Sequence, residues 1–188
     1  MTPPLEANAD DLRIDRYRSY LLLLARIQLD GRAAAKVDAS DIVQQTLLEA
    51  HAKQNQFTGD DDALAAWLRR ALVNNLRDTM RALRRGKRDI RREASLDAQI
   101  DQSSLRLGGL IPAHQSSPSQ QAVRSEALLR LATALEQLPE PQREAIVLHH
   151  LHGWPVVEVA AHLSKSDASV AGLLFRGLRK LRELMPPE

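Results

Sequence analysis

The chain has 188 residues, of which 27% are charged and 3% aromatic, with no cysteine and a formal net charge of +2 at pH 7. The length allows one or two small domains, the scarcity of aromatic residues favours helices over strands, and the lack of cysteine excludes disulfides and thiolate metal sites. The sequence contains no signal-peptide pattern and no apolar run of membrane-spanning length, so we expect a cytoplasmic protein with no membrane partner.

Residues 1–92 form a first block for which three helices are predicted. Apolar residues at helical spacing predict a helix over residues 11–29, a second from Asp38 to about Lys53 and a long third over residues 63–84, with a polar loop at residues 57–62. The side chains expected in the core are Leu12, Tyr17, Tyr20, Leu21, Leu24, Ile27, Ile42, Val43, Leu47, Ala50, Trp67, Leu68, Ala71, Leu72, Leu76, Met80 and Leu83.

The end of the long helix carries the strongest local charge of the sequence. Eight arginines and lysines lie between Arg77 and Arg92, opposed only by Asp78 and Asp89. Cations at a helix C-terminus are favourable by about 0.3–1 kcal/mol each, which accounts for one or two of them as a solvated helix end. The excess predicts contact with a polyanion such as nucleic acid.

Residues 93–116 are predicted to be a linker. They contain Gly108-Gly109, Pro112 and many Ser and Gln, and their apolar residues show no sustained period, so we expect little regular structure in the free protein. The capping box Ser117-Pro118-Ser119-Gln120 predicts the start of a second block, residues 117–188. The expected fold class is therefore all-α, with two small helical domains joined by a flexible linker.

The second block is predicted to hold two helices before residue 154. The first runs to about Gln137, and Leu138-Pro139-Glu140-Pro141 ends it; the next ends at Gly153. The inward side chains expected in these helices are Val123, Leu128, Leu131, Leu135, Ala145, Ile146, Leu148 and Leu151.

Residues 154–184 have the pattern of a helix-turn-helix. A short helix is anchored by Val156, Val159, Ala160 and Leu163, and the polar turn after it contains Ser166, a good N-cap. The inward side chains of the second helix are Val170, Leu174, Leu178 and Leu181. The cations left to reach phosphates are Arg176, Arg179, Lys180 and Arg182. The alternative is an ordinary helical hairpin.

Three stretches of the chain, in order, match the motifs of one family. They are residues 38–50, with the sequence DASDIVQQTLLEA; Trp67-Leu68-Arg69-Arg70 with Asn74, Asp78 and Arg81; and residues 138–184. Together with the linker they cover nearly the whole chain, which resembles the extracytoplasmic-function (ECF) sigma factors, the small two-domain class of bacterial RNA polymerase sigma subunits. The resemblance implies a helix that docks on core RNA polymerase, a helix that melts the downstream (minus-ten) promoter element and a helix-turn-helix that reads the upstream (minus-thirty-five) element.

The resemblance also assigns residues to each of these roles. The polymerase contacts would be Asp38, Asp41, Ile42, Gln44, Gln45 and Leu48, although the two aspartates also suit a helix N-terminus regardless of any partner. The contacts to the downstream element would be Asn74, Asp78, Arg81, Arg84 and Arg85. The contacts to the upstream element would be Ser166, Ser169, Ala171, Gly172, Arg176, Arg179 and Lys180.

The loop and the linker take on roles only through the same resemblance. The family flips a base of the downstream element into a pocket formed partly by the loop before the long helix, here residues 55–62. Phe57 is the only aromatic residue there, and it is either a stacking platform, which contributes about 1–3 kcal/mol per base, or a core residue. The family threads its linker through the polymerase cleft, where the acids Glu93, Asp97 and Asp101 would mimic nucleic acid.

The recognition helix departs from the family pattern. Residues 169–174 read SVAGLL where the family commonly has Thr-Val-Lys-Ser-Arg-Leu, so a Lys and an Arg are missing from the DNA-facing side and the upstream specificity is left open. Leu173 is either core or an exposed apolar contact to a thymine methyl group or a protein. Ser164 stands where the family has Gly, which costs about 1 kcal/mol if the backbone is left-handed there.

No pattern in the chain predicts a catalytic or metal site. His149, His150, His152 and His162 lack the carboxylate spacing of His-Glu-x-x-His, and we find no Gly-rich phosphate loop and no nucleophile elbow, so we expect no cofactor, no metal and no enzymatic activity. The implied partners are core RNA polymerase, promoter DNA and, as a candidate, an anti-sigma factor. The alternative functions are a stand-alone helix-turn-helix regulator and an interaction module whose helix-turn-helix no longer binds DNA.

Overall fold

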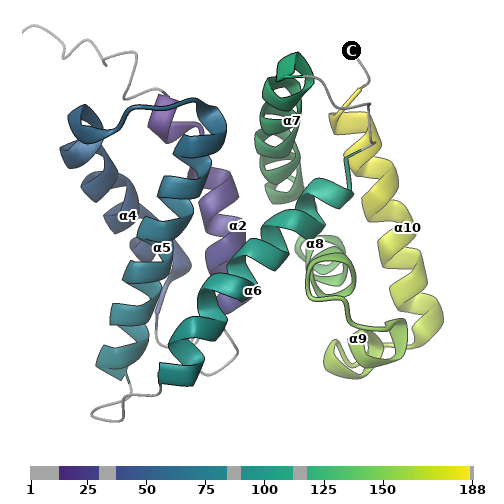
Figure 1. The fold of residues 1–188 in the computed structure, drawn as a ribbon. Coiled ribbons are helices and arrows are strands. Elements are labelled where there is room, and N and C mark those ends of the chain that lie inside the picture. The colour runs from purple at the N-terminus through teal and green to yellow at the C-terminus, as the bar shows by residue number, and fades with distance from the viewer. Residues whose placement is uncertain (1–12, 30–36, 84–89, 112–117, 187–188) are drawn as a thin grey trace, which may run out of the picture. The chain divides into compact units, whose positions relative to one another are not determined.

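The computed structural model describes residues 13–29, 37–83, 90–111 and 118–186 of the chain (Figure 1). Over these residues the regular secondary structure is helical and contains no β-strand, as the composition predicted. The chain divides into two compact units, Met1–Ile100 and Asp101–Glu188, and each is considered by itself. None of the helices in the described segments is long and apolar enough to cross a lipid bilayer.

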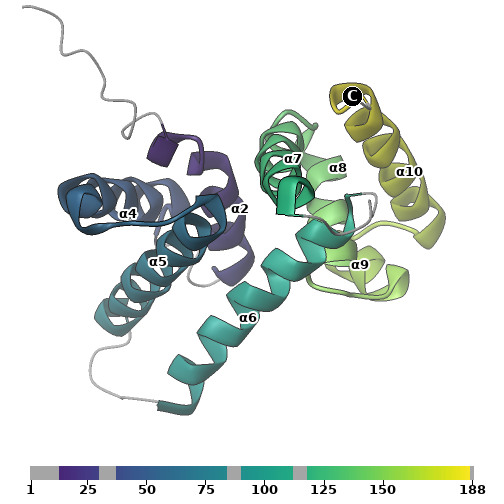
Figure 2. The ribbon, with the colours of Figure 1, turned by 45° about the horizontal axis from the view of Figure 1, so that its top comes forward.

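The first unit is built on three helices that pack side by side: α2 (Arg18–Gln28), α4 (Ala39–Lys53) and α5 (Asp61–Leu83) (Figures 1 and 2). A short 3₁₀ turn, η1 (Gln54–Gln56), follows α4. The predicted core residues that are buried are Tyr17, Tyr20, Leu21, Leu24, Ile27, Ile42, Val43, Leu47, Ala50, Leu68, Leu72 and Leu76. Trp67, Ala71 and Met80 are half-buried, whereas Leu12 and the side chain of Leu83 lie outside the described part of the chain.

The helix predicted over residues 11–29 is interrupted. A single helical turn at residues 13–15 precedes α2, which begins only at Arg18. The Tyr17 amide donates to the Ile14 carbonyl at 3.1 Å, the three-residue spacing of a tight turn, and the regular ladder begins when Leu21 donates to the Tyr17 carbonyl at 2.9 Å. The sequence pattern did not reveal this interruption, because both parts bury apolar side chains on the same side.

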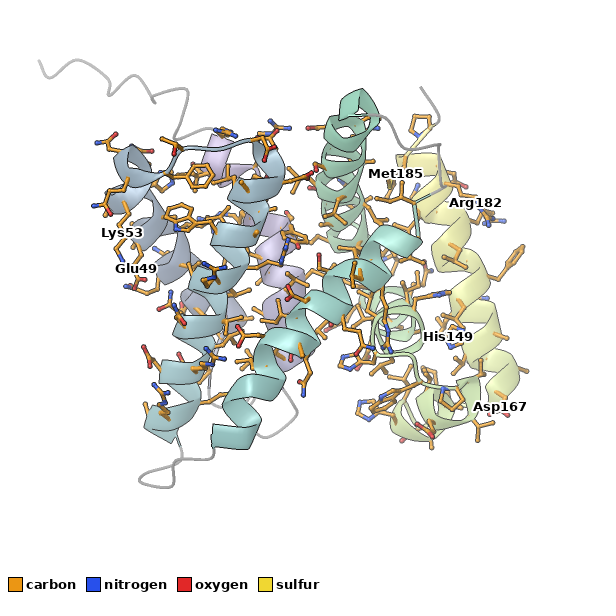
Figure 3. The ribbon with its side chains drawn as sticks, in the orientation of Figure 1. Glu49, Lys53, His149, Asp167, Arg182 and Met185 are labelled. Carbon is orange, nitrogen blue, oxygen red and sulfur yellow. The ribbon has the colours of Figure 1, made fainter. Side chains whose placement is uncertain are left out.

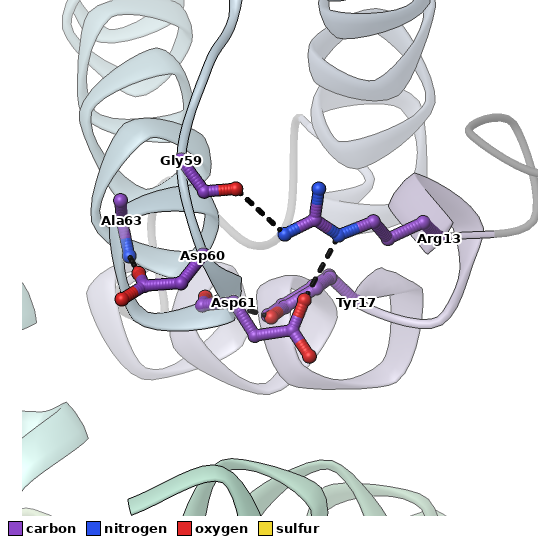
Figure 4. A network of polar contacts seen from close by, with 6 residues as sticks. All are labelled: Arg13, Tyr17, Gly59, Asp60, Asp61 and Ala63. Carbon is purple, nitrogen blue, oxygen red and sulfur yellow. Dashed lines mark hydrogen bonds and ion pairs between the residues drawn. The ribbon is translucent and has the colours of Figure 1, made fainter. Parts of the chain in front are cut away.

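A polar network joins this first turn to the loop before α5 (Figure 4). Arg13 Nε donates to Asp61 Oδ1 at 2.9 Å, and its Nη2 donates to the Gly59 carbonyl at 3.0 Å. The Tyr17 hydroxyl donates to the Asp61 carbonyl at 2.9 Å, and its burial raises the pKa of this hydroxyl above its usual range. The backbone of the loop is therefore held by side chains from a segment far earlier in the sequence.

The region predicted to be an irregular linker is mostly helical, and that prediction was wrong. Helix α6 spans Ile90–Gly109, and the boundary between the two units falls within it, after Ile100. Its buried side chains are Leu96, Ile100, Ser103 and Leu107. Their spacing of four, three and four residues is that of one helix face, so the signal was present in the sequence but was masked by the surrounding Ser, Gln and Gly residues.

Tertiary contacts anchor α6 at two points, one in each unit. In the first unit Arg77 of α5 forms an ion pair with Asp97. In the second unit Arg106 Nη1 donates to the Leu151 carbonyl at 3.0 Å. Arg77 was predicted to contribute to a basic surface and Asp97 to mimic nucleic acid, but the two partly buried side chains pair with each other.

The second unit contains α7 (Pro118–Glu136), α8 (Glu140–Ile146), a π-helical turn η2 (Val147–Leu151), α9 (Val156–His162) and α10 (Asp167–Leu184). The predicted core side chains that are buried are Leu131, Leu135, Ala145, Ile146, Leu148, Leu151, Val159, Ala160, Val170, Leu174 and Leu181. Leu128, Val156, Leu163 and Leu178 are half-buried, whereas Val123 is 55% exposed, so its predicted burial was wrong. Ser117 of the predicted capping box lies outside the described residues, as do the side chains of residues 118–120.

Two glycines shape the second unit. Gly153 has φ +79° and lies in the left-handed region that lets the chain turn from η2 towards α9. Gly177 lies where α10 crosses α8, and a Cβ added there would come within 2.7 Å of the Cδ1 atom of buried Ile146. The close approach of these two helices therefore depends on the absence of a side chain at position 177.

Candidate protein and nucleic-acid interfaces

Helix α4 presents one row of exposed side chains. Asp41, Gln44, Gln45 and Leu48 follow one another at spacings of three, one and three residues and are all exposed, Leu48 to 58%. Ile42 is only 4% exposed, so its assignment as a partner contact was wrong and its side chain supports the helix from within. The row thus combines carboxylate, amide and apolar side chains on one surface of the first unit.

The start of α4 is capped as its sequence predicted. Asp38 Oδ1 accepts a hydrogen bond from the Ser40 amide at 2.8 Å, and this bond lowers the pKa of the Asp38 carboxyl. Asp38 is exposed. Both interpretations of this residue are therefore compatible with its geometry, because a capping carboxylate keeps further lone pairs free for a partner.

A polar bridge fixes α4 against α5. Thr46 is fully buried; its hydroxyl donates to the Ile42 carbonyl at 2.7 Å and accepts from Asn75 Nδ2 at 3.1 Å. Asn75 Nδ2 also reaches Glu49 Oε2 at 3.4 Å, and Gln45 Nε2 donates to Glu49 Oε1 at 2.7 Å. Figure 3 marks Glu49 on α4. The exposed row of α4 is consequently held in one orientation relative to α5.

Helix α5 carries a second exposed row. Asn74, Asp78 and Arg81 are all exposed, and Asp78 Oδ1 accepts from Arg81 Nη1 at 3.1 Å. Arg70, one turn earlier on the same face, is also exposed and extends this row; the predicted contacts did not include it, although its four-residue spacing from Asn74 was visible in the sequence. The other two predicted contacts of this helix, Arg84 and Arg85, lie outside the described residues.

Phe57, in the loop before α5, is partly buried against a neighbouring aromatic ring. Its ring stacks on Trp67 with centroids 5.3 Å apart and planes 25° apart, yet it is only half-buried. A Cβ on Gly59 would lie 2.9 Å from Phe57 Cζ, so the loop backbone also packs against this ring. Asp60 Oδ1 accepts from the Ala63 amide at 2.9 Å and caps the start of α5 (Figure 4). The loop therefore presents a partly exposed aromatic ring whose position is fixed.

The turn and the helix start of the predicted helix-turn-helix have the expected local geometry. Ser166 Oγ accepts from the Ser169 amide at 3.2 Å and caps α10. Ser164 has φ 53°, the left-handed conformation that a glycine would adopt with less strain, so the predicted cost of about 1 kcal/mol applies to it.

Helix α10 exposes most of the residues predicted to contact the upstream element. Ser166, Ser169, Ala171, Arg176, Arg179 and Lys180 are exposed and Gly172 is half-buried. Leu173 is only 8% exposed and therefore belongs to the core. Of the two alternatives left open for Leu173, the structure therefore supports the core position, because its side chain points inward.

Sequence reasoning missed two members of this surface. Phe175 is 66% exposed and Ala168 is exposed as well. Both lie on the same side of α10 as Ala171 and Gly172, which their spacing of three and four residues shows in the sequence.

The cations of α10 lie towards its C-terminal half. Arg179 Nε is 3.8 Å from Glu183 Oε1 and Lys180 Nζ is 3.2 Å from Glu183 Oε2. Exposed pairs of this kind contribute about 0–1 kcal/mol, so both cations can exchange Glu183 for a phosphate at little cost. Figure 3 marks Asp167 and Arg182 at the two ends of the helix.

Four histidines gather where η2 leads into α9. His149 Nδ1 lies 2.7 Å from the Trp154 carbonyl oxygen, and the Trp154 ring contacts His162 edge-on, with centroids 5.2 Å apart. Burial lowers the pKa of His152, with the charge of Arg106 and then His162 as further causes. Burial also lowers the pKa of His150, followed by the effect of His149. Within the described residues no three side chains of His, Asp or Glu converge as a metal site would require.

The second unit is expected to lose stability as the pH falls from about 7.5 to about 5.5. The folded state lowers the pKa of His150 and His152, so the unfolded state binds more protons in this window, and protonation favours unfolding. Urea unfolding followed by Trp154 fluorescence in a Trp67→Phe background measures the effect. A His150→Gln/His152→Gln variant should show a flatter pH dependence, and a wild-type stability that rises towards acid would contradict this expectation.

Comparisons with known proteins place the chain in one family. The family model described as Sigma-70, region 4 matches residues 128–181, which run from α7 through most of α10. The chain is 31% identical to the RNA polymerase sigma factor CnrH of Cupriavidus metallidurans, over 80% of this chain and 74% of that protein. It is 25% identical to the ECF RNA polymerase sigma factor BldN of Streptomyces coelicolor, over 97% of this chain but only 62% of BldN, so the chain spans less than two thirds of that relative.

Among solved structures, the chain is similar to the sigma factor RpoE of Bartonella quintana, determined in complex with the anti-sigma factor NepR. The identity is 26%, the alignment covers 93% of this chain and 92% of that chain, and the TM-score is 0.34. The family assignment therefore rests on the sequence, and it does not favour a stand-alone helix-turn-helix regulator. The identity to CnrH across most of both chains, with the region 4 match over the helix-turn-helix, shows that the chain belongs to the ECF class of RNA polymerase sigma factors, which direct core RNA polymerase to promoters for transcription initiation.

Proposed function

We propose that this sigma factor docks on core RNA polymerase through the exposed row of α4, engages the downstream promoter element with the exposed row of α5, and reads the upstream element with α10. Docking and melting are thereby assigned to residues 1–92, upstream recognition to residues 117–188, and the connection to residues 93–116. The polymerase does the chemistry, and the chain acts in the cytoplasm without enzymatic activity of its own.

The observation that carries the proposal is the composition of the α4 row. A single exposed leucine is common on protein surfaces, but Leu48 lies at the end of a continuous row with Asp41, Gln44 and Gln45. An apolar side chain beside unshielded polar groups is what a protein partner can cover and hydrogen-bond at once. The bridge through Thr46 and Asn75 holds the row rigid, which lowers the entropic cost of binding.

The α5 row and the loop before it support the second part of the proposal. Asn74 can donate to and accept from a base edge, and Arg81 can hold a phosphate. The half-buried Phe57 ring, fixed by Trp67, lies at the N-terminal end of the same helix and offers a surface on which an unpaired base can stack. An anti-sigma factor is a further proposed partner, because the RpoE of Bartonella quintana was solved with one.

Core binding tests the proposal. The Asp41→Ala/Gln45→Ala variant is expected to bind core RNA polymerase at least about tenfold more weakly than wild type, because each lost hydrogen bond contributes about 1 kcal/mol. Both side chains are exposed, so the fold should be unaffected. Size-exclusion chromatography of the mixture, with titration by fluorescence anisotropy, measures the change.

A matched control variant tests whether any loss of core binding is specific to α4 or follows from removing exposed polar side chains in general. Gln137→Ala/Glu140→Ala removes an amide and a carboxylate from exposed positions of the second unit and should leave core binding unchanged. If the α4 variant co-elutes with core RNA polymerase as well as wild type does, the exposed row of α4 is not the docking surface. A folded wild type that fails to co-elute with a cognate polymerase would reject the proposed function as a whole.

A further inference from the structure

The outermost face of α10 is apolar over its first half. Ala168, Ala171, Gly172 and Phe175 lie at spacings of three, one and three residues. The buried side chains of the helix are Val170, Leu173, Leu174 and Leu181, and Gly177 is buried with them. At 100° per residue the two sets fall on opposite sides of the helix, so the apolar row points directly away from the core.

The charges of α10 lie beside or beyond this row. A Cβ added to Gly172 would come within 3.1 Å of Arg176 Nη1, so the Arg176 guanidinium lies back along the helix beside Gly172. Arg179 and Lys180 come one turn later, on the C-terminal side of Phe175. No arginine or lysine occurs among residues 167–174, the first two turns of the helix, so Arg176 is the cation nearest to the apolar row.

This distribution separates two kinds of DNA contact. In a helix-turn-helix the N-terminal residues of the second helix meet base edges, and cations beyond them hold the phosphates. Arginine or lysine bidentate to guanine is the commonest specific contact in the major groove, and the row offers neither. Alanine and phenylalanine side chains instead suit the C5 methyl group of thymine.

We propose that α10 reads thymine methyl groups through Ala168, Ala171 and Phe175, and that the upstream element of this sigma factor is therefore defined by T·A pairs at the positions these side chains face. The inference rests on the proposed role of α10 as the DNA-reading helix and specifies its ligand. Gly172 allows the helix to approach the groove closely, and Arg179 and Lys180, which lie beyond the apolar row, supply affinity through phosphates.

The test uses holoenzyme reconstituted from the full chain and core RNA polymerase. Selection from promoter DNA randomised over the upstream element should return thymine, on either strand, at two or more neighbouring positions. Each selected thymine is then replaced by deoxyuridine, which pairs identically but lacks the methyl group. Loss of one buried methyl group should weaken holoenzyme binding about fourfold at each contacted position.

Variants assign the methyl contact to the helix. In Phe175→Ala, replacing thymine with deoxyuridine should no longer weaken binding at one position and should still weaken it at the others. In Phe175→Leu, part of the weakening at that one position should remain. Phe175 is exposed, so neither change should disturb folding. Arg179→Ala is the matched control: it should weaken thymine and deoxyuridine promoters equally and lower the salt slope by about 1.

The outcomes distinguish this inference from the proposed function beneath it. A selected element with G·C pairs at the contacted positions, or a wild type indifferent to deoxyuridine, overturns methyl readout while promoter recognition stands. A full deoxyuridine effect in Phe175→Ala also overturns the assignment. If the chain binds core RNA polymerase normally but the resulting holoenzyme selects no upstream sequence, α10 does not read DNA.

Discussion

Replacing Gly177 with leucine is expected to lower the free energy of unfolding of the second unit by about 3 kcal/mol. A Cβ at this position already comes within 2.7 Å of Ile146 Cδ1 and 3.4 Å of Gln142 Cβ, and Ile146 is fully buried. Helices α8 and α10 must then separate, which opens the core beneath the recognition helix. Urea denaturation followed by Trp154 fluorescence in a Trp67→Phe background measures the loss.

A second glycine of the same helix provides the control. Gly172 is half-buried, and the atom nearest to an added Cβ belongs to the flexible Arg176 guanidinium. Gly172→Ala should therefore gain up to about 1 kcal/mol from helix propensity, whereas Gly177→Ala should not. Equal effects of the two alanine substitutions would show that propensity, and not the crossing with α8, governs position 177.

Reversing the charge of Arg81 is expected to weaken promoter binding by the holoenzyme about tenfold or more, because a hydrogen bond to a charged group contributes about 1.5–3 kcal/mol. Arg81 lies on the exposed row of α5 with Asn74 and Asp78. Its loss leaves Asp78 without its 3.1 Å partner, which costs little at the surface. Open-complex formation at several salt concentrations measures the effect of Arg81→Glu, and the milder Arg81→Ala should reduce the salt slope by about 1.

Two controls show whether the effect is specific to promoter contact by Arg81: binding to core RNA polymerase, and charge reversal of a distant arginine. Arg81→Glu should bind core RNA polymerase as wild type does, because α4 carries the proposed docking row. Arg18→Glu changes an exposed arginine at the start of α2 and should leave promoter opening intact. An Arg81→Ala variant with an unchanged salt slope would show that this side chain does not contact a phosphate.

The arginines of α5 show that the charge pattern alone does not identify which cations lie on a basic surface. Arg77 and Arg81 are equivalent in the charge pattern of the sequence, yet Arg77 pairs with Asp97 of α6 whereas Arg81 stays on the surface beside Asp78. The partner of Arg77 is twenty residues away, in a segment predicted to lack regular structure. The size of the basic surface could not be predicted without knowing that α6 is a helix packed close to α5 at this point.

Helix α10 shows, at a single position, the same difference between what the sequence pattern indicates and what the packing decides. Comparison with the family motif left Leu173 either in the core or exposed towards DNA, and the structure places it in the core. The apolar side chain that is exposed is Phe175, two residues further along. An amphipathic sequence pattern identifies the centres of the buried and exposed faces of a helix well, but it identifies the boundary between them poorly. Residues at this boundary are buried or exposed according to how closely the neighbouring helix packs.

The helical class, the order of the three family motifs and the helix starts at Asp38 and Ser166 could all be predicted from the chain, because capping and apolar periodicity depend on residues within a few positions of one another. That Arg77 pairs with Asp97 and that Gly177 is the point where α10 crosses α8 could be seen only in the packed structure. These features depend on pairs of residues distant in the chain, and no local preference specifies which distant side chain will be the partner.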